Sequence, residues 1–505
     1  MGHLEIMFAL LFGAVVLVRA ADHIGVPYPI VLVLGGLGLA FVPGMPEIVM
    51  EPHVVLLVFI PPLLMSAGFQ SSARELRAES RALGLLALAL VLVSTVAVAV
   101  AAHTWVDGLS WPAAFMLGAA VAPTDAVAAV ATFASVQVPA RVQRLVEGES
   151  LINDATGLTA FRIALAAVAG GFSAGDALLE FVLAAAGGGL VGVAVAFVGL
   201  RMIRAQPDTT VSVMLTILSA YAAYVAAEEI GASGILAAAV CGVYSGWRQS
   251  EFFDADTRLT ANGFWRILTF GLEALLFVLL GLQLERLAHE VDGHILEYAL
   301  IGLGISALVI VVRVVFALLP IAPGLALRER LVVGWCGMRG AISLAAALSI
   351  PAGTAGRPEV VFLTFIVILV TLVGQGLTLP PVIRALGLDD ERQWSPEEAI
   401  ARMEAAQAAL DRLDELEEEG RIGEDALRRM RDLYQARFRR CVAVIGGEHP
   451  QEAIDEQRLR VRDVRQDLIR TERAAILQLR DEGKISQQVQ RAVERDLDLE
   501  EARLR

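Results

Sequence analysis

Charged residues and cysteine are both scarce in this chain of 505 residues. Only 19% of the residues are Asp, Glu, Lys or Arg, whereas 56% are hydrophobic, and this composition excludes an ordinary soluble enzyme. The three cysteines, Cys241, Cys336 and Cys441, lie far apart without CxxC or metal-ligand spacing, so neither a disulfide framework nor a zinc site is indicated. A net charge of −14 also excludes nucleic-acid binding through a basic surface.

The few charges are distributed unevenly along the chain. Residues 1–388 contain 26 acidic residues and 19 Arg, whereas the much shorter segment 389–505 contains 29 acidic residues and 22 Lys or Arg. The first part is therefore apolar enough to lie in a bilayer and the second is not. We predict an all-α polytopic membrane domain over residues 1–385, followed by a charged helical tail over residues 386–505.

The apolar part is long enough for about thirteen transmembrane helices of roughly 20 residues each. We predict them at 4–20, 28–43, 52–69, 81–102, 111–135, 145–170, 176–203, 209–228, 232–247, 264–284, 294–321, 328–351 and 358–385. Thirteen Arg residues fall on one side of these spans, and only Arg286 and Arg357 on the other. By the positive-inside rule the N-terminus lies outside and the tail is cytoplasmic, as expected for a multi-pass protein of the plasma (inner) membrane.

The tail begins with a helix-start signal. Ser395 is suited to the N-cap and Pro396 to the first helical position, and apolar residues then recur at helical spacing until Gly420. Two or three further amphipathic helices are expected over residues 422–503. Charged helices of this kind usually have solvated faces, so we expect a helical domain that packs on itself or on a partner copy.

Two predicted spans contain residues that interrupt a helix. The fifth contains Ala122-Pro123-Thr124-Asp125, and the twelfth contains Cys336-Gly337-Met338-Arg339-Gly340. Each is the middle member of a three-helix group, within the predicted core helices 81–170 and 294–385. Interrupted helices in corresponding positions indicate inverted repeats and the midplane site of a secondary transporter. A simple kink at Pro123 in a packed helix is the alternative.

The sixth span carries the densest run of polar residues, from Glu147 to Gly157. Helical spacing places Ser150 and Asp154 on one face, and Glu149 and Asn153 on the adjacent face. Oxygen atoms of Asp154, Ser150 and the interrupted segment around Thr124 form a donor set for a small alkali cation. A structural cluster of ion pairs without transport is the alternative.

Buried arginines in the membrane part need carboxylate partners. We expect Glu149 to pair with Arg339, which leaves Asp154 unpaired and able to titrate. Glu273 and Arg313 lie on neighbouring spans and are expected to pair with each other. Asp125 is suited to neutralise the positive helix ends at the first interruption.

These motifs resemble those of the sodium/proton exchangers of the monovalent cation:proton antiporter family, in the bacterial branch with an Asn-Asp pair. The resemblance rests on Pro123-Thr124-Asp125, on the EGESLINDATG run and on the GMRGAISLA run, and it covers nearly all of residues 1–385. It implies six helices in a mobile core with two crossed broken helices, and a scaffold that forms a homodimer. It also implies that Asp154 carries the ion, with Thr124 and Ser150 as further ligands. Asn153 and Asp125 would support the site, and Glu149 would pair with Arg339.

The third span departs from the family pattern. Many members continue Pro-Pro-Leu-Leu-Phe with an acidic residue, whereas this chain has Met65 and then Ser66. The second carboxylate near the ion path is therefore missing from this position, which bears on the choice between Na⁺ and K⁺.

A single titrating carboxylate predicts electroneutral exchange of Na⁺ for H⁺ by alternating access, contributing to intracellular pH and sodium homeostasis. Li⁺ and K⁺ are alternative cations, and a K⁺/H⁺ antiporter or a non-transporting membrane sensor are alternative functions. Enzyme activity is not expected, because His103, His289 and His294 lie in predicted outer loops away from acidic groups. No cofactor is expected beyond the transported Na⁺ and H⁺. The expected partners are monovalent cations, protons, the lipid bilayer and a second copy of the chain, without nucleic acid.

Overall fold

Helices make up all the regular structure in the part of the chain that the computed structural model describes. This part comprises residues 3–42, 55–71, 73–133, 136, 138–168, 174–206, 208–291, 293–320, 324–388, 396–419 and 423–445, with a few single residues between 468 and 497. The chain divides into two units, Met1–Asp390 and Glu391–Arg505, and each is described by itself.

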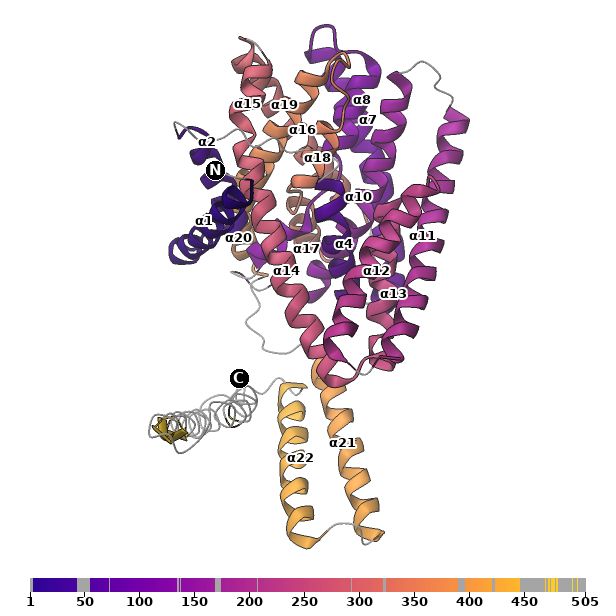
Figure 1. The fold of residues 1–505 in the computed structure, drawn as a ribbon, viewed down its shortest axis with the longest axis vertical. Helices are drawn as coiled ribbons and strands as arrows, with labels where there is room; N and C mark the ends of the chain where they lie inside the picture. Colours follow the sequence, from indigo (N-terminus) through magenta and orange to yellow (C-terminus); the bar gives the residue numbers. More distant parts are fainter. Residues whose placement is uncertain are drawn as a thin grey trace. The chain divides into compact units, whose positions relative to one another are not determined.

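The helices of the first unit follow the predicted spans, and every predicted span overlaps at least one of them (Figure 1). The first half contains α1 (His3–Ile24), α2 (Tyr28–Ala40), η1 (Val55–Phe59), α4 (Ile60–Gln70), α5 (Ala73–Ala78), α6 (Ser80–Gly84), η2 (Leu85–Leu90), α7 (Val91–Trp105), α8 (Trp111–Val121), α9 (Ala126–Phe133), α10 (Ala140–Val168) and α11 (Ala174–Arg204). The second half contains α12 (Thr209–Glu229), α13 (Gly234–Phe252), α14 (Ala255–Leu282), α15 (Leu284–Glu290), α16 (Ile295–Leu318), α17 (Leu327–Trp335), α18 (Ala341–Leu348), α19 (Arg357–Leu369), η3 (Val370–Gln375) and α20 (Gly376–Ala385).

Eight helical stretches among the described residues are long and apolar enough to cross a membrane, and Tyr28–Ala40 and Leu56–Gln70 are shorter apolar helices. The polytopic membrane fold is thus confirmed, while the count of thirteen spans stays a prediction. Only 17% of the apolar stretch of helix α11 is buried within the protein. Its exposed Leu183 and Leu190 form a surface suited to lipid or to another apolar helix.

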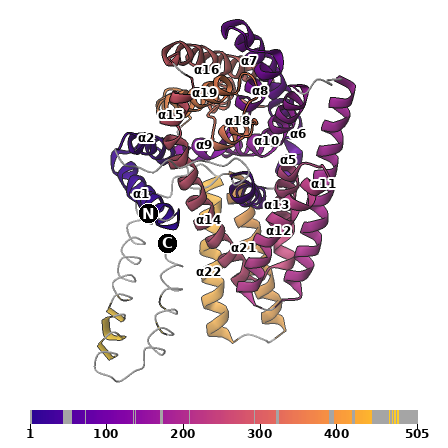
Figure 2. The same cartoon turned by 45° about the horizontal axis from the view of Figure 1, so that its top comes forward.

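The helices of the first unit pack as two groups. The core group is defined here as α6 to α10 with α16 to α20: α8 packs on α7, α10 and α19, and α16 packs on α7, α17 and α19. The scaffold group is defined as α1, α2, α4 and α11 to α14: α13 packs on α4 and α11, and α14 packs on α2. Figure 2 shows much of the core group gathered together at the top of the view.

Both predicted interruptions are confirmed. The helix α8 ends at Val121 and α9 begins at Ala126, on either side of Pro123, which has no N–H to donate. The helix α17 ends at Trp335 and α18 begins at Ala341, on either side of the Gly337–Gly340 segment. The backbone N–H of Asp125 donates to the carbonyl of Met338 at 2.8 Å. The two interruptions therefore meet, and a simple kink at Pro123 is excluded.

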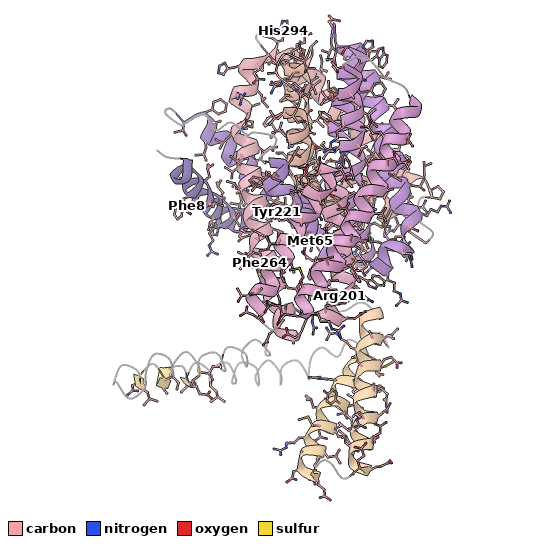
Figure 3. The ribbon with its side chains drawn as sticks, turned by 45° about the vertical axis from the view of Figure 1, so that its right-hand side comes forward. Phe8, Met65, Arg201, Tyr221, Phe264 and His294 are labelled. Carbon is pink, nitrogen blue, oxygen red and sulfur yellow. The ribbon has the colours of Figure 1, made fainter. Side chains whose placement is uncertain are left out.

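The two ends of the first unit carry different loops. His294 lies at one end and Arg201 at the other (Figure 3). This separation agrees with the alternate assignment of the loops before α16 and after α11 to opposite sides of the membrane.

The second unit contains a hairpin of two helices, α21 (Pro396–Glu418) and α22 (Glu424–Ile445). The Arg431 side chain crosses between them and pairs with Asp414 at 2.5 Å and Glu417 at 2.8 Å. The expected helix that begins at Pro396 is confirmed. The predicted N-cap Ser395 lies outside the described residues, as do nearly all residues of the helices predicted beyond Ile445.

Candidate cation site

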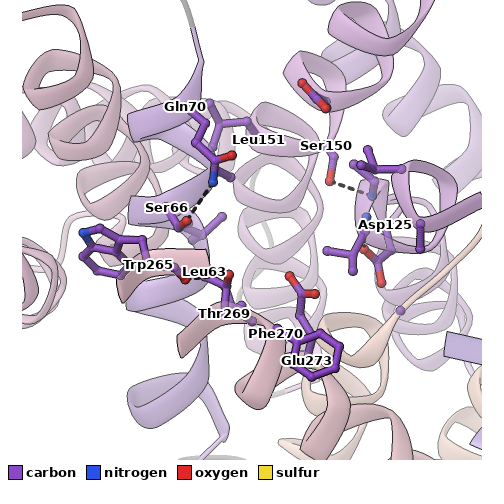
Figure 4. Close-up of a pocket in the computed structure, with 18 of the residues that line it drawn as sticks. Leu63, Ser66, Gln70, Asp125, Ser150, Leu151, Trp265, Thr269, Phe270 and Glu273 are labelled. Carbon is purple, nitrogen blue, oxygen red and sulfur yellow. Dashed lines mark hydrogen bonds between the residues drawn. The ribbon is translucent and has the colours of Figure 1, made fainter. Parts of the chain in front are cut away.

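A cavity of about 800 Å³ lies between the core group and the scaffold group (Figure 4). On one side it is lined by the first interruption and by α9, α10 and α18, and on the other side by α2, α4 and α14. The three predicted cation ligands, Asp154, Ser150 and Thr124, all line this cavity. The fold thus brings together oxygen donors from the fifth and sixth predicted spans.

Asp154 is the carboxylate of α10 that faces this cavity. Its side chain is 6% exposed, and within the described residues it makes no hydrogen bond and no ion pair. A buried carboxylate without a partner is energetically costly. Asp154 can therefore accept a cation or a proton without first breaking a contact within the protein.

Ser150 and Asp125 hold the start of α9. Ser150 Oγ accepts a hydrogen bond from the backbone N–H of Ala126 at 3.2 Å, and Asp125 Oδ1 accepts one from the N–H of Val127 at 2.8 Å. The first N–H groups of a helix have no partner inside the helix and need such caps. The Asp125 side chain also lies against Gly340, where a Cβ atom would overlap its Oδ2. Its negative charge thus lies near the positive N-terminal ends of both α9 and α18.

Arg339 lies at the opposite, negative helix ends. Its Nε donates to the carbonyl of Val121 at 2.9 Å, at the end of α8, and its Nη1 donates to the carbonyl of Gly337, just after α17. The backbone N–H of Arg339 donates to Thr371 Oγ1 at 3.2 Å. A cation near helix C-termini is stabilised by the free carbonyl groups there. The Arg339 side chain therefore binds backbone oxygens.

The expected ion pair between Glu149 and Arg339 is wrong. Glu149 pairs instead with Arg313 of α16, through Nη1 to Oε1 at 2.5 Å and Nη2 to Oε2 at 2.7 Å. Glu149, Arg313 and Arg339 are each at most 2% exposed. The two parallel bonds match the planar guanidinium to the carboxylate. The expected pair of Glu273 with Arg313 is also wrong, because Arg313 is bound to Glu149.

Thr124 connects this ion pair to the cavity, and Asn153 holds Thr124 in place. Asn153 Nδ2 donates to Thr124 Oγ1 at 2.9 Å, and Thr124 Oγ1 donates in turn to Glu149 Oε1 at 3.4 Å. A hydroxyl group that donates one bond and accepts one still has a lone pair available. Thr124 is thus oriented by Asn153 and Glu149 while an acceptor position remains for a ligand in the cavity.

The scaffold wall of the cavity carries two pairs of hydrogen-bonded polar groups that were not predicted as partners from the sequence. Glu273 Oε2 accepts a hydrogen bond from the Tyr28 hydroxyl at 3.0 Å, and Ser66 Oγ accepts one from Gln70 Nε2 at 3.0 Å. All four residues line the cavity. The ionisable Glu273 in an apolar span was the one available signal, but its partner on α2 is 245 residues away in sequence.

Comparisons with known proteins find similar sequences and a similar fold. The model of the family described as sodium/hydrogen exchanger, transmembrane, matches residues 6–385. The chain is 32% identical to the uncharacterized Na⁺/H⁺ exchanger Rv2287 of Mycobacterium tuberculosis, over 98% of this chain and 97% of that protein. It is 35% identical to the sodium, potassium, lithium and rubidium/H⁺ antiporter of Bacillus pumilus, over 70% of this chain and 57% of that protein. The solved structure of the sodium proton antiporter MjNhaP1 from Methanocaldococcus jannaschii superposes with a TM-score of 0.63 at 20% identity, over 77% of this chain and 99% of that chain.

Proposed function

Because the chain belongs to the sodium/hydrogen exchanger family, we propose that it exchanges Na⁺ for H⁺ across the plasma membrane with Asp154 as the carrier of either ion. Two observations support the site: Asp154 is buried without a partner among the described residues, and it lines a cavity that also contains Ser150 and Thr124. The Na⁺ or H⁺ bound to Asp154 is the substrate of the transporter, and no catalysed reaction is involved.

The proposed exchange follows from competition at one carboxylate. A proton and a Na⁺ ion each neutralise the buried charge of Asp154, but both cannot be bound to it at the same time. Each crossing of the barrier then carries one positive charge in either direction, so exchange of one Na⁺ for one H⁺ is electroneutral. A lower pH raises the Na⁺ concentration needed for half-maximal exchange, because protons occupy Asp154 more often.

The neighbouring groups have distinct proposed roles. Ser150 Oγ and Thr124 Oγ1 complete the oxygen ligands of the cation, as suits a hard alkali ion. Asn153 orients Thr124, and Asp125 neutralises the N-terminal ends of α9 and α18. Glu149 supports the first interruption by accepting a hydrogen bond from Thr124, and Arg339 supports the crossing by donating to backbone carbonyls of both interrupted helices.

The cavity supports a conformation that is open to the cytoplasm. Its lining includes Glu147 and Arg266, which lie toward the Arg-rich side that the positive-inside rule assigns to the cytoplasm. Alternating access then requires the core group to move against the scaffold group and expose Asp154 on the other side. We propose that the scaffold forms a homodimer, for which the exposed apolar surface of α11 is available.

The test is dye-reported proton flux in proteoliposomes with imposed gradients of Na⁺, Li⁺ or K⁺ over a series of pH values. The wild type is expected to show Na⁺-dependent proton flux, and Asp154→Asn and Asp154→Ala are expected to show none. Glu229→Gln is the matched control, because Glu229 is exposed and lies outside the cavity lining. Wild-type rates in Asp154→Ala would disprove the assignment of Asp154. The absence of cation-dependent flux in the wild type would support the sensor instead.

A further inference from the structure

We propose that Glu273 forms a second cation-binding position in the cavity, on the scaffold wall, where a monovalent cation from the cytoplasm is held before it reaches Asp154. The proposal rests on the proposed function, since it concerns the route by which the same cation enters. It assigns to α14 a part in cation affinity, whereas the motifs of the sequence place all the ligands on the core group.

Glu273 lies on the scaffold helix α14 and faces the cavity. Figure 4 shows its carboxylate directed into the space that also contains Asp125 and Ser150. The Tyr28 hydroxyl donates to Oε2 at 3.0 Å and so fixes the orientation of the carboxylate. One neutral hydrogen bond leaves the second oxygen available and does not neutralise the charge.

Glu273 has no cationic partner among the described residues. Arg313, the expected partner, is bound to Glu149. Arg266 also lines the cavity, but it lies seven residues earlier in α14, about 10 Å along the helix axis, and it forms no ion pair with Glu273. The charge of Glu149 is therefore neutralised by an arginine inside the protein, whereas the charge of Glu273 faces the cavity.

The position of Glu273 suits the approach of a cation to Asp154. The other described scaffold residues that line the cavity carry no carboxylate, and Ser66, on the facing part of α4, is uncharged. A negative charge on the wall of a cavity raises the local concentration of cations. Since Glu273 and Asp154 line the same cavity, a cation at Glu273 can be transferred to Asp154 while the cavity is open to the cytoplasm.

The experiment measures how exchange in proteoliposomes depends on Na⁺ concentration. In Glu273→Gln we expect the Na⁺ concentration for half-maximal exchange to rise about tenfold, which corresponds to about 1.4 kcal/mol, with the maximal rate within about twofold of wild type. Glu273→Asp keeps the charge and is expected to recover most of the affinity. The control Glu229→Gln, which removes the same charge from an exposed position outside the cavity, is expected to behave as the wild type.

Tyr28→Phe gives a second, independent test. It removes the hydroxyl that orients the carboxylate and keeps the charge, so we expect a rise of about two- to threefold in the half-maximal Na⁺ concentration. This variant decides the question if Glu273→Gln yields no folded protein, and an unchanged value would then overturn the proposal.

The proposed site and the proposed function can fail separately. Wild-type Na⁺ dependence in Glu273→Gln, together with complete loss of exchange in Asp154→Asn, would overturn the role of Glu273 and leave the exchanger function intact. An equal drop in the maximal rates of Glu273→Gln and Glu273→Asp, without a change in Na⁺ dependence, would show a structural role and also overturn it. The absence of Na⁺-dependent proton flux in the wild type would contradict the proposed exchanger function itself.

Discussion

The two interrupted helices place opposite charges at opposite helix ends. At the first interruption, Asp125 lies near the N-terminal ends of α9 and α18. At the second, Arg339 binds carbonyl groups at the C-terminal ends of α8 and α17. Asp125 from the first interruption and Arg339 from the second thus each stabilise helix ends of both interrupted helices. The crossing neutralises its own helix dipoles and does not need Glu149 for this purpose.

The arginine that neutralises Glu149 comes from an uninterrupted helix. Arg313 of α16 forms two bonds with that carboxylate, so the fixed charges of the core are balanced without Asp154. The membrane unit thus contains two kinds of buried charge. Charges at the crossing are bound to partners and hold the helices, whereas Asp154 and Glu273 face the cavity without a cationic partner among the described residues.

The largest effect on stability is expected for Arg313→Ala. Removing this partner leaves the Glu149 carboxylate buried and unpaired, at a cost of about 3 to 5 kcal/mol in the free energy of unfolding. The measurement is the unfolding midpoint in detergent, followed with a thiol-reactive dye that reports the exposure of the buried cysteines Cys241 and Cys336. The double variant Arg313→Ala with Glu149→Gln should recover part of the loss. A double variant less stable than the single one would contradict the pairing.

A smaller loss is expected for Arg339→Ala. This change removes two charge-assisted hydrogen bonds to the carbonyls of Val121 and Gly337, but it leaves no carboxylate without a partner. We expect a cost of about 1.5 to 3 kcal/mol, measured in the same unfolding assay. Glu149→Gln should not rescue this variant. Rescue by Glu149→Gln would show that Glu149 exchanges between the two arginines, and would contradict the assignment of Arg339 to backbone carbonyls alone.

Local sequence signals were sufficient for the interruptions and for the face of α10 that lines the cavity. Pro123 lacks an N–H, and Gly337 and Gly340 lack side chains, so each segment contains residues that disfavour a continuous helix. The i, i+4 spacing of Ser150 and Asp154 follows from helical geometry alone. These features depend on residues that are neighbours in the chain, which is why they could be predicted.

The partners of the buried charges could not be predicted in the same way. Glu149 and Arg313 are 164 residues apart in sequence, and Arg339 and Arg313 are equally plausible partners at the level of composition and depth. Only the packing of α16 on α17 and the position of Val121 decide which arginine reaches the carboxylate. The same holds for Glu273, whose exposure to the cavity depends on the packing of α14 against α2.

The smallest effect is expected at the first interruption, in Ser150→Ala. The change removes the acceptor for the N–H of Ala126, so we expect a loss of about 1 kcal/mol in stability, typical of an N-cap. As Ser150 is also a proposed ligand, the half-maximal Na⁺ concentration should rise by about two- to threefold. Ser343→Ala is the matched control, because Ser343 lines the same cavity from α18 and its hydroxyl makes no hydrogen bond within the described residues. Equal changes in stability and in half-maximal Na⁺ concentration in both variants would show that these effects come from a hydroxyl in the cavity lining and not from the cap of α9.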